Sequence, residues 1–126
     1  MSGGIWYDLG SVALPIASVI CGLILWKATP QPNSLFGYRT RRSLQSGSAW
    51  IFAQKTAGRL FVTVYSAMIP FSLAAAILSD IYFDSDGRYW TLMGIVAFQI
   101  AVMVLINLRI ERRLKTVFDE DGNLRG

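Results

Sequence analysis

Three long apolar segments, separated by polar ones, dominate the pattern of this sequence. They cover residues 9–26, 60–79 and 89–108, and none of them contains Asp, Glu, Lys or Arg. Each is about 18 to 20 residues long, which as a helix is enough to cross a bilayer core of roughly 30 Å. The pattern therefore predicts an all-α integral membrane protein with three transmembrane helices in one domain, residues 1–126.

The first apolar segment is expected to stay in the mature protein. The residues before it carry no Lys or Arg, and Trp26 and Lys27 stand where a signal peptide would have its small-residue cleavage site. Pro15 and Pro70 lie inside the first and second segments. A bend at either proline is tolerable in a membrane helix.

Composition supports the membrane interpretation. Hydrophobic residues make up 53% of the chain and charged residues 16%, whereas soluble domains are about a quarter charged. A chain of 126 residues could not bury so much apolar surface within itself. The net charge of +4 would suggest nucleic acid in a soluble protein, but here the cations flank apolar segments, so we expect no direct nucleic-acid contact.

The basic residues predict an orientation. Eleven of the twelve Lys and Arg residues lie in the loop 27–59 or the tail 109–126, and Arg88 is the exception. The positive-inside rule makes that side cytoplasmic. We therefore expect a multi-pass plasma-membrane protein with its N-terminus outside, its C-terminus inside, and an acidic hairpin loop at 80–88 outside.

Tryptophans mark the same two boundaries. Trp6 and Trp90 stand at the predicted outer ends of the first and third helices, and Trp26 and Trp50 on the inner side. Indole rings favour the headgroup level of a membrane. Their positions therefore agree with the orientation predicted from charge.

The loop 27–59 is expected to be extended first and helical later. Pro30 and Pro32 exclude helix, and Asn33 is typical of a turn. Ser46 and Ser48 are both candidate N-caps. We expect an interfacial helix from about residue 46 that runs into the second membrane helix near residue 59.

The third helix is expected to continue into the cytoplasm for two or three turns beyond residue 108. Glu111 and Lys115 stand at i and i+4 there, a spacing that favours an ion pair on one face of a helix.

The same loop carries a spaced pattern that is uncommon in membrane proteins. Its residues are Pro32, Asn33, Phe36, Gly37, Tyr38, Arg39, Thr40, Ser43, Trp50 and Gly58. This pattern resembles the SdpI family of bacterial membrane proteins, which is named for an immunity protein against a secreted peptide toxin. The similar core covers about residues 26–60, and the acidic tail 118–123 is similar to family C-termini.

The resemblance implies a binding or immunity protein whose motif residues brace the fold or contact a partner. These residues are Asn33, Phe36, Gly37, Tyr38, Arg39, Thr40, Ser43 and Trp50. For Arg39 we favour a specific role, either structural, on free helix-end carbonyls, or in binding an anion. Four other cations of the loop are expected to contact anionic lipid headgroups: Arg41, Arg42, Lys55 and Arg59.

Polar and small residues inside the membrane segments predict helix contacts. Gln99 and Asn107 share one face of the third helix, and hydrogen bonds to neighbouring helices are a better explanation for them than a ligand path. The small-residue pairs Ser18–Gly22 and Ala97–Ala101 suggest close packing between helices.

The chain offers little catalytic chemistry. It has no His, and its one cysteine, Cys21, is expected to be a packing residue. No nucleophile and base pair stands out, and the acidic stretches 84–87 and 119–123 are more typical of turns than of calcium loops. We therefore expect no enzymatic activity, no cofactor and no metal.

Three functional hypotheses remain from the sequence. The first is immunity to a secreted peptide toxin, bound at the membrane by the outer helix ends and the hairpin 80–88. The second is a small accessory subunit of a larger membrane complex. The third and weakest is transport, because no ionisable residue inside the membrane segments marks a route.

Overall fold

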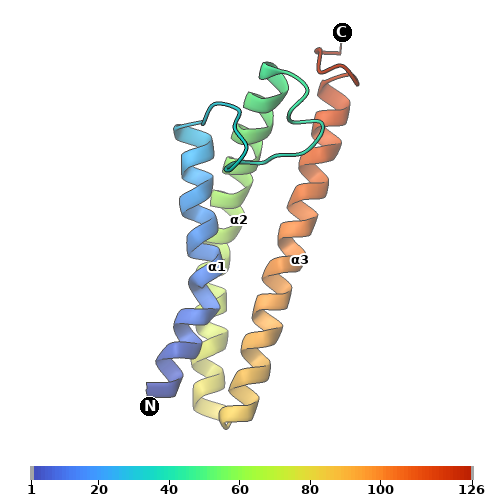
Figure 1. Ribbon diagram of the computed structural model, residues 1–126. Coiled ribbons are helices and arrows are strands. Elements are labelled where there is room, and N and C mark those ends of the chain that lie inside the picture. The colour runs from blue at the N-terminus through green and yellow to red at the C-terminus, as the bar shows by residue number, and fades with distance from the viewer. Residues whose placement is uncertain (1, 126) are drawn as a thin grey trace.

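Three helices make up most of the computed structural model, which describes residues 2–125 and the side chains from residue 5 onward. They are α1 (Ser2–Lys27), α2 (Gly47–Tyr82) and α3 (Ser85–Val117). All three are long and apolar enough to cross a membrane, as predicted. Figure 1 shows them as one elongated bundle with the two chain ends at opposite ends of the molecule.

Two of the helices are much longer than a membrane core. α2 has 36 residues and α3 has 33, which gives lengths of about 50 Å against a core of roughly 30 Å. The predicted interfacial segment after residue 46 is the continuous first part of α2. α3 continues nine residues past the predicted end at 108, to Val117.

The predicted hairpin loop at 80–88 is wrong, because only Phe83 and Asp84 separate α2 from α3. Asp84 is the N-cap of α3, and its Oδ1 accepts a hydrogen bond from the Gly87 nitrogen at 2.9 Å. This cap satisfies an otherwise unpaired helix-end nitrogen and so favours an early helix start. Asp86 and Gly87, expected to form a turn, therefore lie in the first turn of α3.

α1 and α2 pack closely where two glycines meet. A Cβ atom added to Gly58 would lie 2.5 Å from the carbonyl oxygen of Gly22. Ser18, one helical turn before Gly22, is also buried. The predicted contact through Ser18 and Gly22 is thus confirmed, and it joins α1 to α2.

The other small-residue pair behaves differently. Ala97 and Ala101 are both exposed on the outer face of α3, so the expected packing between helices is wrong within this chain. Figure 1 shows why, since α3 stands apart from the close α1–α2 pair along much of its length.

Gln99 joins the three helices near their middle. Its Nε2 donates to the Ser11 carbonyl of α1 at 2.7 Å and to Ser72 Oγ of α2 at 2.9 Å. The Tyr65 hydroxyl of α2 donates to the Gln99 carbonyl at 2.9 Å. The predicted role of Gln99 in hydrogen bonding between helices is confirmed.

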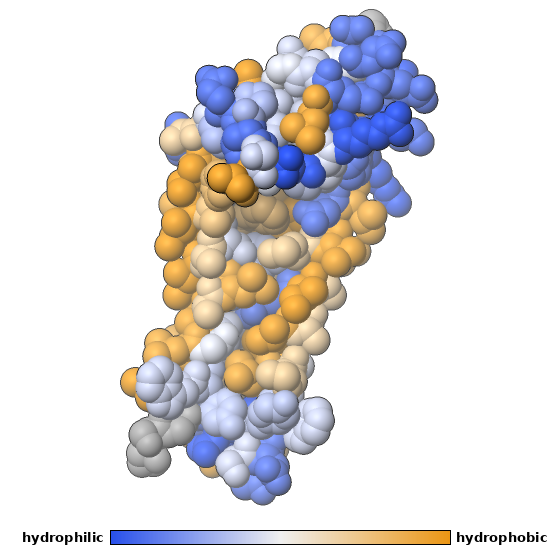
Figure 2. Space-filling model, in the orientation of Figure 1, coloured by the Kyte–Doolittle hydropathy of each residue, from blue (hydrophilic) through white to orange (hydrophobic). Residues whose placement is uncertain are grey.

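The two ends of the bundle differ in chemistry. Figure 2 shows an apolar band between two hydrophilic ends. We call the end formed by the loop 28–46 and the tail 118–125 the basic end, and the end formed by the start of α1 and the Phe83–Asp84 connection the turn end. Together with the adjoining helix ends, residues 27, 47–59 and 109–117, the basic end holds eleven of the twelve Lys and Arg residues.

Candidate functional site

The centre of the motif loop is a pair of hydrogen bonds between Tyr38 and Gln54. The Tyr38 nitrogen donates to Gln54 Oε1, and Gln54 Nε2 donates to the Tyr38 carbonyl, both at 2.7 Å. A side-chain amide can supply one acceptor and a donor in this way. Gln54 is fully buried in α2, so it fixes the loop backbone against that helix.

Gly37 makes this pairing possible. Its φ is +117°, and an added Cβ would lie 2.8 Å from Gln54 Oε1 and 3.2 Å from the ring of Trp50. Only glycine adopts such a backbone without strain, and only glycine leaves this space free. The position of Gly37 in the motif thus follows from the close approach of the loop to α2.

The side chain of Tyr38 reaches the third helix. Its hydroxyl donates to Glu111 Oε1 at 2.7 Å, and the Asn107 carbonyl oxygen lies 3.2 Å away. Burial, together with the neighbouring Glu111 carboxylate, raises the pKa of Tyr38 above its ordinary value. Tyr38 therefore contacts both α2 and α3, and its hydroxyl stays protonated as a hydrogen-bond donor.

Glu111 does not pair with Lys115 as the sequence suggested. No salt bridge between these two residues is present in the described part of the chain, and Glu111 instead accepts the hydrogen bond from Tyr38. A buried tyrosine donor close to a helix can outcompete a solvated ammonium group, because exposed ion pairs contribute little.

Local hydrogen bonds shape the rest of the loop. Asn33 Oδ1 accepts from the nitrogens of Leu35 and Phe36 at 2.8 and 2.7 Å, which turns the chain after the prolines. Ser43 is buried, and its Oγ accepts from the Thr40 nitrogen at 2.8 Å. Such side-chain bonds replace the secondary structure that the loop lacks.

Trp50 belongs to the core of this site rather than to a belt at the headgroup level. It is almost fully buried, and its Nε1 donates to the Pro30 carbonyl at 2.8 Å. The sequence placed Trp50 among the boundary tryptophans, and that expectation is wrong. Trp6 and Trp90, by contrast, are strongly exposed at the turn end.

The charged residues of the loop are not part of this hydrogen-bonded cluster. Arg39, Arg41 and Arg59 are exposed, and within residues 2–125 the Arg39 guanidinium makes no hydrogen bond or ion pair. Arg42 lines a small mixed-charge hollow with Glu111 and other residues. Contact of these groups with anionic lipid remains a prediction.

Lys55 has a structural contact. Its Nζ donates to the Trp26 carbonyl at 3.3 Å, one of the carbonyls left free at the C-terminal end of α1. A cation at this position complements the helix dipole.

The C-terminal tail closes the basic end. Ser46 is the N-cap of α2: its Oγ accepts from the Ala49 nitrogen at 3.0 Å and donates to the Gly122 carbonyl at 2.6 Å. The tail folds back on itself through a bridge between Phe118 and Leu124. Ser46 thus connects the start of α2 to the end of the chain.

Gln54 and Glu111 are the two central residues that sequence reasoning missed. The position of Gln54 in the sequence could have indicated its role. It follows Trp50 by four residues and shares a helix face with Ala53 and Ala57. An amide on an otherwise apolar helix face requires a partner. For Glu111 we find no comparable signal, because the sequence offers Lys115 as a plausible partner.

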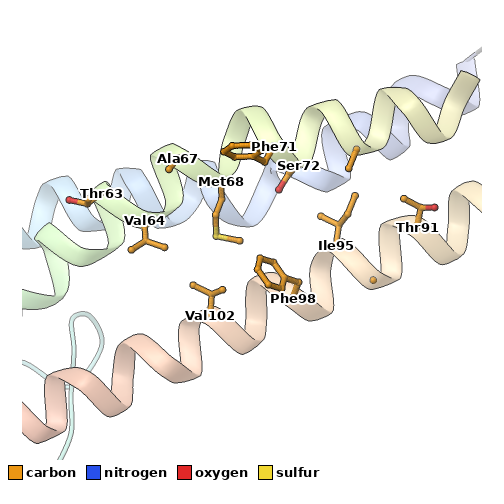
Figure 3. Close-up of a pocket in the computed structure, with 12 residues that line it drawn as sticks. Thr63, Val64, Ala67, Met68, Phe71, Ser72, Thr91, Ile95, Phe98 and Val102 are labelled. Atoms are coloured by element: carbon orange, nitrogen blue, oxygen red, sulfur yellow. The ribbon is translucent and has the colours of Figure 1, made fainter.

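An apolar groove separates α2 and α3 in the membrane-spanning part. Its volume is about 900 Å³. Figure 3 shows Val64 and Met68 from α2 facing Ile95, Phe98 and Val102 from α3 across this space. No described charged residue lines the groove.

The turn end gathers aromatic and acidic residues. Tyr82 and Trp90 are strongly exposed there, and Arg88 Nε lies 3.9 Å from Asp80 Oδ1. The Arg88 guanidinium also lies 5.6 Å from the centre of the Tyr7 ring. Exposed aromatic rings beside charged residues are typical of a helix end at the membrane–water interface.

The described residues do not assemble a recognisable catalytic or metal site. Across residues 2–125, no three His, Cys, Asp or Glu side chains come together as metal ligands. The buried polar cluster around Tyr38 uses its groups to hold the loop against α2 and α3.

Comparison with known proteins agrees with the loop pattern. A family model described as the SdpI/YfhL protein family matches residues 29–108. The matched segment contains the motif loop from residue 29, all of α2 and most of α3. The predicted resemblance is confirmed, whereas no curated protein and no solved structure matches the chain.

Proposed function

This chain belongs to the SdpI/YfhL protein family, and from that membership we propose that it protects a bacterial membrane against a secreted peptide toxin by binding the toxin at the membrane. The family and the three apolar helices identify a multi-pass membrane protein. The observation that carries the proposal is the match over residues 29–108, which includes every motif residue from Pro32 to Gly58. The proposed action is stoichiometric binding without catalysis.

Orientation decides which end meets the toxin. The positive-inside rule supports a cytoplasmic basic end, which leaves the turn end outside. A secreted toxin arrives from that side. The turn end is therefore the proposed binding surface, and the motif cluster at the opposite end braces the three helices.

The chemistry of the turn end fits a cationic amphipathic peptide. Four aspartates and one arginine gather there, while Tyr82 and Trp90 are exposed beside them. Acidic groups attract a basic peptide over several ångströms, and exposed aromatic rings are frequent anchors in binding surfaces. The four aspartates are Asp8, Asp80, Asp84 and Asp86.

The experiment is expression in a toxin-sensitive bacterium that is then challenged with candidate secreted peptides. We expect improved survival with the native chain. Asp86→Asn and Tyr82→Leu should reduce protection, since each removes an exposed group at the turn end. Asp121→Asn and Phe98→Leu are matched controls, because those residues are also exposed but lie away from the turn end, and they should leave protection unchanged.

Two results would contradict the proposal. Killing that is unaffected by the native chain, at an expression level confirmed in membranes, would count against immunity. Equal loss of protection in the turn-end variants and their controls would count against the turn end as the binding surface.

A second candidate function is that of an accessory subunit, favoured by Ala97 and Ala101. Both are exposed on α3, and small residues allow another membrane helix to approach closely. Purification in mild detergent should then recover a fixed partner that Ala97→Leu releases and Ala74→Leu, at another exposed position, retains. Recovery of the chain alone would contradict this function.

A further inference from the structure

A second crevice lies between α1 and α3, directly beneath the motif loop. Its volume is about 560 Å³, within the usual range for small-molecule sites. It exists because α1 packs against α2 while α3 stands apart. Figure 2 shows this face, with apolar helix surfaces below the hydrophilic loop.

The crevice is mainly apolar, with Ser18 and Asn107 as polar side chains in its helical walls, and it is cationic at one end. Leu14, Ala17 and Cys21 line it from α1, and Met103 lines it from α3. At the loop end Arg39 lines it, and no described acidic side chain does. The combination suits a ligand with an apolar tail and an anionic head.

The length of the crevice matches one leaflet of a bilayer. Its lining on α1 extends from Leu14 to Leu25, eleven residues that rise about 16 Å along the helix. Half of a hydrocarbon core is roughly 15 Å. Because α1 and α3 are membrane-spanning, the open side of the crevice faces lipid, and an acyl chain can enter it sideways.

The state of Arg39 supports an anionic head group. Its guanidinium makes no hydrogen bond or ion pair within residues 2–125, although its neighbour Tyr38 is fixed by bonds to α2 and α3. A rigid backbone therefore presents an unpaired guanidinium at the mouth of an apolar slot. Guanidinium groups bind phosphate oxygens through two parallel hydrogen bonds.

We propose that this crevice binds one anionic phospholipid, with an acyl chain between α1 and α3 and the phosphate on Arg39. In this site Arg39 binds the phosphate of the lipid. Arg41 does not line the crevice and so has no such role. Bound lipid would fill the space that helix packing leaves empty beneath the loop.

The test counts lipids that stay bound to the protein. The native chain is reconstituted in vesicles of phosphatidylglycerol and phosphatidylcholine, extracted in mild detergent and examined by native mass spectrometry. We expect one retained phosphatidylglycerol. Arg39→Gln should retain about tenfold less, the worth of a charged hydrogen bond, while Arg41→Gln, exposed two residues away, should retain as much as the native chain.

A second pair of variants tests the apolar part. Ala17→Leu adds bulk to the crevice wall and should lower retention, while Ala13→Leu, on the same helix and exposed outside the crevice, should not. Because Ala17 is itself exposed, the larger side chain leaves the helix packing intact, and circular dichroism checks the fold.

Several outcomes would overturn the site. If Arg39→Gln and Arg41→Gln lost the same amount of bound lipid, Arg39 would act only through its surface charge and would not form a specific site. Displacement of the lipid by inorganic phosphate alone would remove the role of the acyl chain. Phosphatidylcholine retained as well as phosphatidylglycerol, or a dimer of the chain in place of lipid, would overturn the proposed ligand.

Discussion

Gly58 of α2 lies against the backbone of Gly22 of α1, with no room for a side chain on either residue. A Cβ on Gly58 would lie 2.5 Å from the Gly22 carbonyl oxygen, and a Cβ on Gly22 would lie 2.8 Å from the Gly58 carbonyl oxygen. The two glycines set the distance between the helices that carry the ends of the motif loop. Gly58 is thus a motif residue with a packing role.

Gly58→Ala should therefore destabilise the protein. The added methyl group forces α1 and α2 apart, and overpacking of this kind costs about 1–3 kcal/mol. Thermal unfolding in detergent measures the effect. Gly94→Ala is the control, since nothing lies within 4 Å of a Cβ at that position, and its unfolding midpoint should not fall. A stable Gly58→Ala variant would show that the helices can separate freely.

Gln54→Leu should loosen the motif loop. The substitution leaves the Tyr38 nitrogen without a partner, at about 1–3 kcal/mol for a buried group, and leaves the Tyr38 carbonyl with Ser43 Oγ as its remaining donor. Hydrogen exchange at the Tyr38 amide should become faster, and the unfolding temperature should drop. Gln31→Leu, in the exposed part of the same loop, provides the comparison. Unchanged exchange at Tyr38 would mean that another group holds the loop.

Tyr38 should make the free energy of unfolding decrease with pH in the alkaline range. Because burial and Glu111 raise the pKa of Tyr38 in the folded state, the unfolded chain loses this proton first, near the ordinary value of about 10. The contribution of the protonated Tyr38 hydroxyl to the free energy of unfolding is therefore complete below that pH and declines above it. Between about pH 10 and 11 the native chain should lose about 1 kcal/mol that Tyr38→Phe does not lose.

Unfolding midpoints measured from pH 8 to 11 check this difference. Tyr82→Phe is the control, because that side chain is exposed and should follow the native pH curve. At pH 8 Tyr38→Phe should already be less stable by about 1.5–3 kcal/mol, the worth of a hydrogen bond to a carboxylate. Parallel curves for all three proteins would contradict the raised pKa.

Ser46 caps the start of α2, whereas Ser48 lies inside the helix and does not. Substituting each serine by alanine therefore distinguishes the loss of the cap from the loss of a serine side chain. Ser46→Ala removes the acceptor for the Ala49 nitrogen and the donor to the Gly122 carbonyl, so it should cost about 1 kcal/mol. Ser48 is exposed within α2, and Ser48→Ala should be neutral or slightly stabilising. Thermal unfolding of the two single variants decides, and equal effects would exclude Ser46 as the cap.

The helices were predictable because lipid imposes a simple rule. A segment that crosses a bilayer must satisfy its backbone internally and expose apolar side chains, and both properties are readable in sequence. The ends were less predictable. Asp84 caps α3 through Gly87, whereas the sequence pattern favoured a turn over residues 84–87, because Asp86 directly precedes Gly87.

The motif residues were visible in sequence, but their partners were not. Tyr38 bonds to Gln54, sixteen residues later, and to Glu111, seventy-three residues later. Long-range pairs of this kind depend on how the helices pack, which local propensity does not encode. Gln99 was easier, because a lone amide in an apolar helix has few alternatives to bonding a neighbouring helix.

The position of Tyr38 has a consequence for the order of assembly. α2 and α3 are joined by two residues, so they can form a hairpin early, whereas α1 closes a much longer loop. Tyr38 reaches Gln54 and Glu111 only once α2 and α3 are together. We therefore expect the motif loop to acquire its native structure after the α2–α3 hairpin has formed, so that the protection of the Tyr38 amide from exchange reports a formed hairpin.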